Sequence, residues 1–170
     1  MSPRIVVLIS GNGSNLQAII DAINSKTLNG QIVLVVSNKD SAYGLTRATQ
    51  AEIPTLIFPL KPYKDLGKTR IEYDIDLAKK IKEYNPNLIV LAGADSIKRA
   101  YEAFKKGEIT KTGVMVHKVI PDVDKGEPLL IEEVSIFETD SLNDLETRIH
   151  TVEHRLIVQC VKKILDELNH

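Results

Sequence analysis

"LISGNGSNLQ" (residues 8–17) joins an apolar run to a segment with helical periodicity. Four apolar side chains follow the spacing of one helix face: Leu16, Ile19, Ile20 and Ile23. A buried strand therefore leads into an amphipathic helix through a short turn that contains two glycines. Strand-to-helix connections of this kind are the unit from which alternating α/β folds are built.

The glycine turn is a candidate anion site. Gly11 and Gly13 can adopt a positive φ and let a ligand approach the backbone, while Ser14 or Asn15 can cap the helix. Unpaired amide N–H groups at a helix start suit a phosphate. The alternative is a plain connection that holds no ligand. Because the turn has neither the P-loop Lys-Ser/Thr nor a third dinucleotide-type glycine, the expected ligand is a compact monophosphate.

The composition favours one globular domain over residues 1–170, with 43% hydrophobic residues and a net charge of −1. This charge balance supplies no broad positive field for DNA or RNA, so we expect no nucleic-acid partner. No apolar stretch is long enough to span a bilayer, so we expect no membrane partner. The single cysteine, Cys160, is expected to be a buried thiol in a reducing, cytoplasmic setting.

The first half of the chain alternates strand and helix patterns. After the glycine turn we expect strands at 31–38, 55–60 and 87–93 and helices at 43–52 and 69–84. In the second of these helices the apolar spacing is carried by Ile71, Ile75, Ala78 and Ile81. This alternation predicts a doubly wound, mainly parallel sheet flanked by helices.

The second half changes character. A helix that starts near Asp95 should end at Gly107, and strands at 113–120 and 129–137 should form a hairpin. The last helix should begin at a capping box of Ser141 and Asp144. We therefore expect mixed pairing near the C-terminal edge of the sheet.

Three polar clusters could carry chemistry. The turn "VHKVIPDVDKGEP" places Asp122 and Asp124 after a strand that carries His117. Its carboxylates could orient a histidine or raise its pKa, or the turn could simply be solvated. They are too few for a calcium loop.

In "HTVEHR", His150, Glu153 and His154 match the spacing of inverted zinc peptidases, but no third ligand is evident. Glu153 flanked by histidines could instead bind hydroxyls or an amine of a polar ligand.

The third cluster is basic. Lys61, Lys68 and Arg70 lie between the third strand and its helix, in a stretch that we expect to be a loop. They are either ordinary surface charge or, for Arg70 above all, a binding group for a ligand carboxylate.

Together, five segments resemble one family, the folate-dependent phosphoribosylglycinamide (GAR) formyltransferases, and its monofunctional fungal members above all. These segments are "RIVVLISGNGSNLQAIIDAI", "VVSNKDSAYGLTRA", "PNLIVLAG", "TGVMVHKVIPDVDKGEPLL" and "LETRIHTVEHRLIV". The resemblance covers nearly the whole chain. It implies a formyltransferase fold and transfer of the formyl group of 10-formyltetrahydrofolate to the amine of GAR. These are small-molecule substrates, and no metal is implied.

The resemblance also implies roles for residues of this sequence. Gly13, Ser14 and Asn15 would bind the substrate phosphate, and His150 and Glu153 its ribose and amine end. Asp124 would raise the pKa of the catalytic histidine. Arg70 would bind the folate, and the pterin would be contacted by Ile120, Pro121, Asp122, Val123 and Asp124.

The chain departs from this family directly after Gly93. There the family continues with an apolar folate-lining stretch, a strand and an Asn-x-His-Pro segment that bears the oxyanion-stabilising asparagine and the proton-donating histidine. Here Gly93 is followed at once by Ala94, and neither His117 nor His150 takes that histidine's place. Either the native protein carries residues that these 170 lack, which the intact flanking motifs favour, or the loss is real. A real loss would leave a phosphoribosyl- or folate-binding protein with impaired catalysis.

Overall fold

The structure is a computed structural model that describes residues 2–92, 97–119 and 126–168. It divides into two compact units, the first formed by residues 1–93 with 164–170 and the second by residues 94–163.

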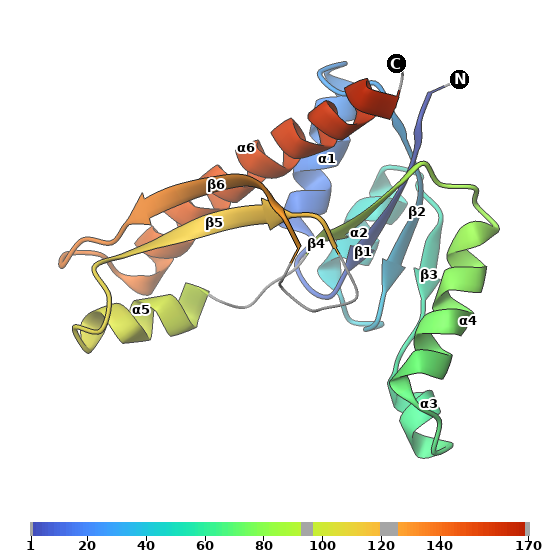
Figure 1. Ribbon diagram of the computed structural model, residues 1–170, viewed down its shortest axis with the longest axis horizontal. Coiled ribbons are helices and arrows are strands. Elements are labelled where there is room, and N and C mark those ends of the chain that lie inside the picture. Colours follow the sequence, from blue (N-terminus) through green and yellow to red (C-terminus); the bar gives the residue numbers. More distant parts are fainter. Residues whose placement is uncertain (1, 93–96, 120–125, 169–170) are drawn as a thin grey trace. The chain divides into compact units, whose positions relative to one another are not determined.

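The first unit is built on a four-stranded parallel sheet (Figure 1). Its strands are β1 (Arg4–Ile9), β2 (Gln31–Ser37), β3 (Thr55–Ile57) and β4 (Leu88–Ala92). Their order is β3-β2-β1-β4, and Val7 of β1 lies opposite Val35 of β2 and Val90 of β4. The expected doubly wound parallel sheet is confirmed, and in the described residues it ends at β4.

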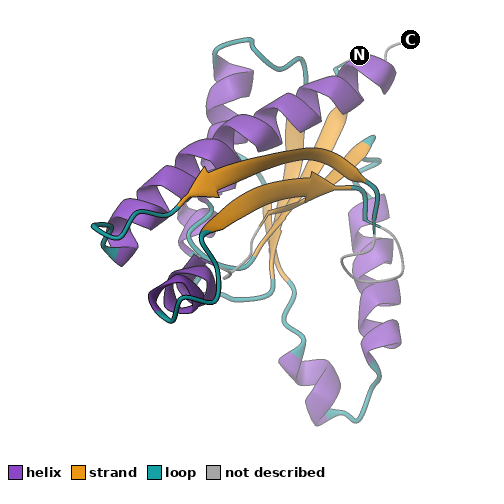
Figure 2. Cartoon of the chain, turned by 60° about the vertical axis from the view of Figure 1, so that its left-hand side comes forward, coloured by secondary structure: helices purple, strands orange, loops and turns teal. Residues whose placement is uncertain are grey.

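Helices cover both faces of this sheet (Figures 1 and 2). They are α1 (Ser14–Asn24), α2 (Tyr43–Gln50), the short α3 (Lys61–Asp65) and α4 (Arg70–Lys82). From β1 through β3 the chain moves along the sheet in one direction, and it then crosses back to β4. Because such crossovers are right-handed, this reversal places α4 on the face opposite α1 and α2.

The α4 helix buries only part of the apolar stripe that its isoleucine spacing predicts, together with Tyr73, which lies outside that stripe. Tyr73 and Ile81 are buried, and Ile81 packs in a cluster with Val6, Val36 and their neighbours. Ile71, by contrast, is 70% exposed. The helix was predicted correctly. The face that packs on the sheet contains Tyr73 and Ile81, and Ile71 lies outside it.

The second unit combines a hairpin with two helices. Its elements are α5 (Ile97–Lys105), β5 (Lys111–His117), β6 (Pro128–Ser135) and α6 (Leu142–Leu168), which continues into the first unit. The antiparallel β5–β6 pair is confirmed and forms a two-stranded sheet of its own. After α5, Gly107 adopts a φ of 73° and its amide N donates to Phe104 O (2.8 Å), as its expected capping role requires. The α6 capping box is also formed, because Ser141 Oγ accepts from Asp144 N and Asp144 Oδ2 accepts from Ser141 N.

A buried ion pair supports the start of α6. Asp140 is 8% exposed and receives both Nη atoms of Arg148, at 2.7 and 2.8 Å. It also accepts from the Phe137 amide N at 2.8 Å. The Arg148 hydrogen bonds, followed by the Phe137 amide, lower the pKa of the Asp140 carboxyl to about 2. The aspartate is therefore a carboxylate over the whole physiological pH range.

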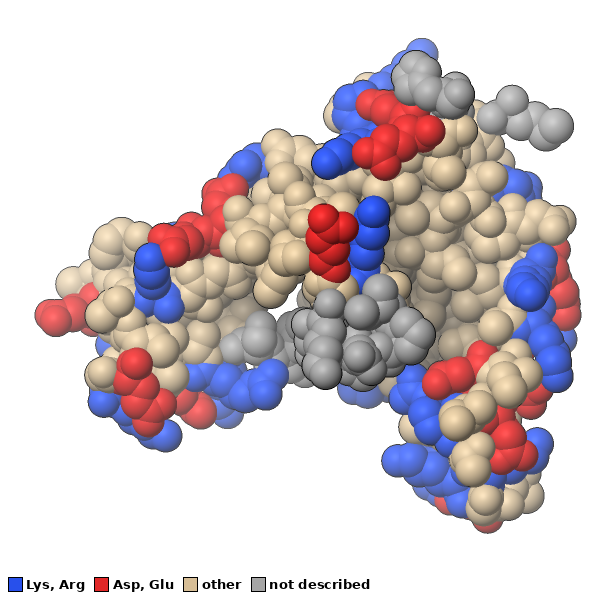
Figure 3. All heavy atoms as spheres, viewed as in Figure 1, with Lys and Arg blue, Asp and Glu red and all other residues tan. Residues whose placement is uncertain are grey.

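The surface carries charges of both signs. On the face in view in Figure 3, basic and acidic side chains lie interspersed, in keeping with the net charge of −1. No helix within the described residues is long and apolar enough to cross a membrane. Cys160 is buried, as expected, and burial raises the pKa of its thiol.

Candidate functional site

The glycine turn forms the mouth of the first strand-to-helix connection. Gly13 occupies the helix-capping position with a φ of 74°, in the left-handed region. The first helical hydrogen bond runs from Gln17 N to Gly13 O (3.0 Å). The amide N–H groups of Ser14, Asn15 and Leu16 precede that bond and stand at the positive end of the α1 dipole. This arrangement can bind an anion.

The expectation that Ser14 or Asn15 caps this helix is wrong. The cap is Gly13, and within the described residues there is no side-chain hydrogen bond at this cap. With Gly13 as the cap, Ser14 and Asn15 are the first two residues of the helix itself. The amides therefore remain available to a ligand.

Asn15 adds an unused acceptor to the turn. Its Oδ1 is buried and has no hydrogen-bond partner among the described residues. A buried acceptor without a partner carries a desolvation cost, which a ligand donor would relieve. A hydroxyl beside a phosphate is such a donor, so the turn suits a sugar phosphate.

The α2 helix closes one side of the turn. Gly44 N donates to Gly11 O at 3.1 Å. A Cβ placed on Gly13 would lie only 2.6 Å from Gly44 Cα, so backbone packs directly on backbone here. Glycine at both positions permits this approach.

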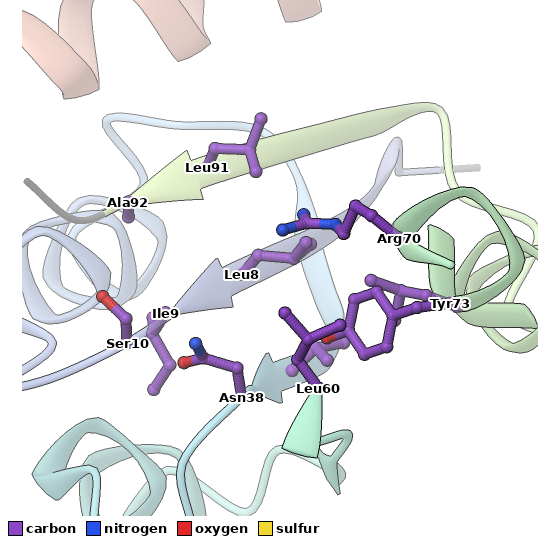
Figure 4. A pocket seen from close by; sticks show the side chains of 11 residues that line it. Leu8, Ile9, Ser10, Asn38, Leu60, Arg70, Tyr73, Leu91 and Ala92 are labelled. Carbon is purple, nitrogen blue, oxygen red and sulfur yellow. The ribbon is translucent and has the colours of Figure 1, made fainter. Parts of the chain in front are cut away.

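A pocket of about 210 Å³ opens at the carboxyl ends of the strands (Figure 4). Ile9 and Ser10 border it at the end of β1, Asn38 follows β2, and Leu91 and Ala92 belong to the end of β4. The β1/β4 pair is where the strand order reverses, the usual ligand position in open α/β sheets. Ser10 directly precedes the glycine turn, so pocket and turn adjoin within the first unit.

Arg70 extends over this pocket (Figure 4). Its Nε donates to both carboxylate oxygens of Asp74, at 2.8 and 3.0 Å, and its guanidinium lies 5.3 Å from the Tyr73 ring centroid. Neither Nη bonds to any described residue, so both can receive a ligand anion. Tyr73 is held in turn by its hydroxyl, which donates to Phe58 O at 2.7 Å.

The basic loop expected around Arg70 is partly helical. Lys61 begins α3 and Arg70 is the first residue of α4. The helix start is fixed by Thr69 and Glu72, which form a capping box. Lys61 pairs with Asp65 at 2.7 Å, and Lys68 Nζ lies 5.1 Å from the Tyr63 ring centroid. Of the three cations, Arg70 is the one that lines the pocket.

The α6 helix carries His150, Glu153 and His154 in the second unit. Burial raises the pKa of the Glu153 carboxyl, an effect that His150 partly opposes. Glu153 forms no hydrogen bond with the described residues, so it can accept one from a ligand. The His150 and His154 rings stack with centroids 6.0 Å apart.

The zinc interpretation of these residues gains no support from the described residues. Within them, no group of three or more His, Cys, Asp or Glu side chains is placed to hold a metal ion.

The predicted site residues thus fall into three sets. Gly13, Ser14, Asn15 and Arg70 lie in the first unit, and His150 and Glu153 in the second. Ile120, Pro121, Asp122, Val123 and Asp124 lie outside the described residues.

Sequence reasoning missed Ser10, Asn38 and Arg47. The first two directly follow β1 and β2, a position that points to ligand contact in open α/β sheets. Arg47 carries no such signal, because its contacts with the turn come from residue 12 and residue 17, far away in sequence.

The comparisons agree with this fold. The chain matches the family described as Formyl transferase over residues 3–97 and 92–161. Phosphoribosylglycinamide formyltransferase of Dictyostelium discoideum is 42% identical, with 95% of this chain and 98% of the relative covered. The protein of that name from Schizosaccharomyces pombe is 40% identical, with 98% and 99% covered. The solved structure of glycinamide ribonucleotide transformylase 1 from Symbiobacterium toebii has a TM-score of 0.86 and 28% identity, covering 98% of this chain and 89% of that one.

The same comparisons locate the departure from the family. The Dictyostelium alignment spans 201 positions against 170 residues in this chain, so at least 31 positions have no residue here. The two matched parts share residues 92–97, which is where the expected interruption after Gly93 lies. On both sides of it the match is continuous, and the chain belongs to the formyl transferase family, among the phosphoribosylglycinamide formyltransferases.

Proposed function

We propose that this protein transfers the formyl group of 10-formyltetrahydrofolate to the amine of GAR, in purine biosynthesis. The observation that carries the proposal is the glycine turn, where the amides of Ser14 and Asn15 follow a left-handed Gly13 and donate to no other described residue. A monoester phosphate is the ligand that such a turn accepts best. The identity of the substrate beyond its phosphate is inferred from the names of the relatives.

The GAR molecule would be bound at two places. Gly13, Ser14 and Asn15 form the phosphate-binding loop, and the Asn15 Oδ1 atom supplies an acceptor for a sugar hydroxyl. Glu153, with His150 on the same helix, would bind the ribose and the amine end. The raised pKa of Glu153 suits this role, because a desolvated carboxylate gains more from a cationic or hydrogen-bonding ligand than an exposed one.

The folate would lie at the strand-end pocket. Arg70 offers to a ligand carboxylate two Nη atoms that bond to no described residue, and the apolar wall of Leu8, Leu60 and Leu91 can take a ring or a methylene chain. A cavity of about 210 Å³ holds only part of such a ligand. The turn from Ile120 to Asp124 would contact the pterin.

The reaction exchanges one C–N bond for another. The GAR amine nitrogen bonds to the formyl carbon, the carbon's bond to the folate nitrogen breaks, and the amine proton passes to that nitrogen. Asp124 would raise the pKa of the histidine that delivers this proton. The attack on the formyl carbon gives a tetrahedral intermediate whose oxygen is an oxyanion. Backbone amides and an asparagine are groups that stabilise such an oxyanion in acyl transfer.

A second candidate function rests on a specific absence. The 170 residues contain four histidines, and none of them stands in an Asn-x-His-Pro sequence. A chain without that centre would still bind a phosphoribosyl compound or a folate but would transfer the formyl group slowly. This candidate is a binding protein of the same fold.

Formation of formyl-GAR from GAR and 10-formyltetrahydrofolate, followed by mass spectrometry, separates the two candidates. Turnover that is lost in Asp124→Asn and retained in Glu127→Gln supports the transferase. Glu127→Gln is the control, because it also removes one carboxylate from the same region. Binding of GAR without turnover supports the binding protein. If the protein binds neither GAR nor 10-formyltetrahydrofolate and forms no formyl-GAR, both are wrong. The intact mass of the native protein decides whether residues are missing, since a value above 18.9 kDa requires them.

We also propose that both compact units belong to one formyltransferase domain, because the family match runs through both. The buried, unpaired Cys160 thiol favours a reducing, cytoplasmic location.

A further inference from the structure

We propose that Arg47 is a positioning residue for the glycine turn, and that it holds the amides of residues 13–15 in the geometry that a phosphate needs. The proposal rests on the phosphate-binding role proposed for that turn. It assigns no direct ligand contact to Arg47, whose effect passes through Asn12 and Gln17.

Arg47 forms hydrogen bonds on both sides of the phosphate-binding amides. Its Nε donates to Asn12 O at 3.0 Å, and its Nη2 donates to Asn12 Oδ1 at 2.9 Å. Its Nη1 donates to Gln17 Oε1 at 3.2 Å. One guanidinium therefore ties the residue before Gly13 to the first turn of α1.

The position of the guanidinium is itself fixed. Arg47 lies on α2, one turn after Tyr43, and its guanidinium carbon lies 4.9 Å from the Tyr43 ring centroid. The same helix packs on the turn through Gly44, whose amide donates to Gly11 O. The backbone contact and the arginine bonds thus connect the turn to one rigid element.

The turn needs such a support because it contains two glycines. Glycine loses more conformational freedom on ordering than any other residue, so an unsupported Gly-Asn-Gly turn would be ordered at the expense of ligand affinity. A turn already held in its binding geometry avoids that loss. Arg47 would therefore change affinity for the phosphate, even though it does not touch it.

The chemistry calls for arginine at this position. A planar guanidinium donates to three acceptors in a fixed fork, whereas a lysine ammonium is a point charge that cannot match them all. The acceptors are two amide side chains and a carbonyl, all uncharged, and Arg47 forms no ion pair with the described residues. Its positive charge thus also remains close to the turn. Arg47→Lys keeps this charge and removes the fork, so it separates positioning from attraction.

The test measures the dissociation constants of GAR and of inorganic phosphate by calorimetry. Phosphate titrations that follow the amide NMR signals of Gly13, Ser14 and Asn15 show where binding occurs. We compare the wild type with Arg47→Lys, Arg47→Met and Asn12→Ala. Arg4→Lys is the matched control, because Arg4 at the opposite end of β1 also donates through Nε to a backbone carbonyl, that of Tyr84 at 2.8 Å. Urea unfolding of every variant reports global stability.

We expect Arg47→Lys to bind both ligands about tenfold more weakly, as the loss of charge-assisted hydrogen bonds predicts. Asn12→Ala should weaken binding less, because the backbone carbonyl of Asn12 remains. In the Arg47→Lys/Asn12→Ala double variant the two effects should not add. Arg4→Lys should bind as the wild type does.

Three results would overturn the inference. If Arg47→Lys binds normally and only Arg47→Met binds weakly, charge alone acts. If Arg47→Lys and Arg4→Lys lose stability to the same extent and neither loses affinity, the role is merely structural. If phosphate shifts no amide of residues 13–15 in the wild type, the phosphate-binding role of the turn fails, and the inference fails with it. The first two results leave that role intact, so the two failures are distinguishable.

Discussion

Replacing Gly13 with alanine tests the geometry of the turn directly. At a φ of 74°, alanine adopts the left-handed region, at a cost of about 1–2 kcal/mol in unfolding free energy. The new Cβ would also lie 2.6 Å from Gly44 Cα, where ordinary contact begins near 3.4 Å. Since the Cβ would meet a backbone atom of α2 and not a flexible side chain, α2 must move away, and the 3.1 Å bond from Gly44 N to Gly11 O weakens by about 1 kcal/mol.

Gly11→Ala is the matched control. It lies two residues away in the same turn, its φ is not positive, and a Cβ there would have no heavy atom within 4 Å. Both substitutions reduce the freedom of the unfolded chain equally, so this effect cancels in the comparison. We expect Gly13→Ala to be less stable than Gly11→Ala by about 2–3 kcal/mol in urea unfolding at neutral pH.

The same variant should lose affinity for inorganic phosphate, because the amides of Ser14 and Asn15 shift with the turn. Equal stability of Gly13→Ala and Gly11→Ala would refute the left-handed capping geometry. A destabilised Gly13→Ala protein that still binds phosphate like the wild type would refute the link between that geometry and the ligand.

Further predictions concern the second unit. The wild type should lose stability as pH falls from about 4 to about 2, because the pKa of Asp140 in the folded protein lies below the unfolded value of 3.8. Asp140→Asn should be less stable than the wild type at pH 7. Between pH 4 and pH 2 the urea midpoint of Asp140→Asn should change less than that of the wild type. Glu153→Gln should unfold at higher urea than the wild type at pH 7 yet bind GAR more weakly, because burial raises the Glu153 pKa and penalises its charged form. This gain in urea midpoint should vanish below pH 4.5, the ordinary pKa of a glutamate, because the Glu153 carboxyl of the wild type is then protonated in both the folded and the unfolded protein. A gain that persists below pH 4.5 would contradict the assignment of the raised pKa to burial. The Cys160 thiol should react with a disulfide reagent only after unfolding, and rapid reaction in the native protein would show that it is accessible.

Much of the fold could be predicted from local patterns. The glycine turn, the capping box at Ser141 and the Gly107 helix end depend on residues within one or two turns of each other, so their signals lie side by side in the sequence. The same locality explains the errors. Ser14 and Asn15 are good capping residues in general, but the left-handed turn at Gly13 moves the cap one position earlier.

The candidate site could be predicted in part. The residues proposed to bind phosphate and Arg70 followed from the glycine turn and from the resemblance to a family, because each lies in a recognisable segment. Asn38 lies in one of those segments as well, and its place directly after a strand is the local signal that could have identified it. Its position at the carboxyl end of β2, beside the end of β1, makes it a pocket residue.

The sequence by itself determined the succession of strands and helices along the chain except α3, the glycine turn, the membership of a family and the interruption after Gly93, because each depends on neighbouring residues. The tertiary structure alone decided which stripe of α4 is buried, that Ser10, Asn38 and Arg70 line one pocket, and that Arg47 reaches Asn12 from 35 residues away. The physical reason is that these contacts depend on strand order and on the direction of each crossover, which bring together side chains that no local pattern relates.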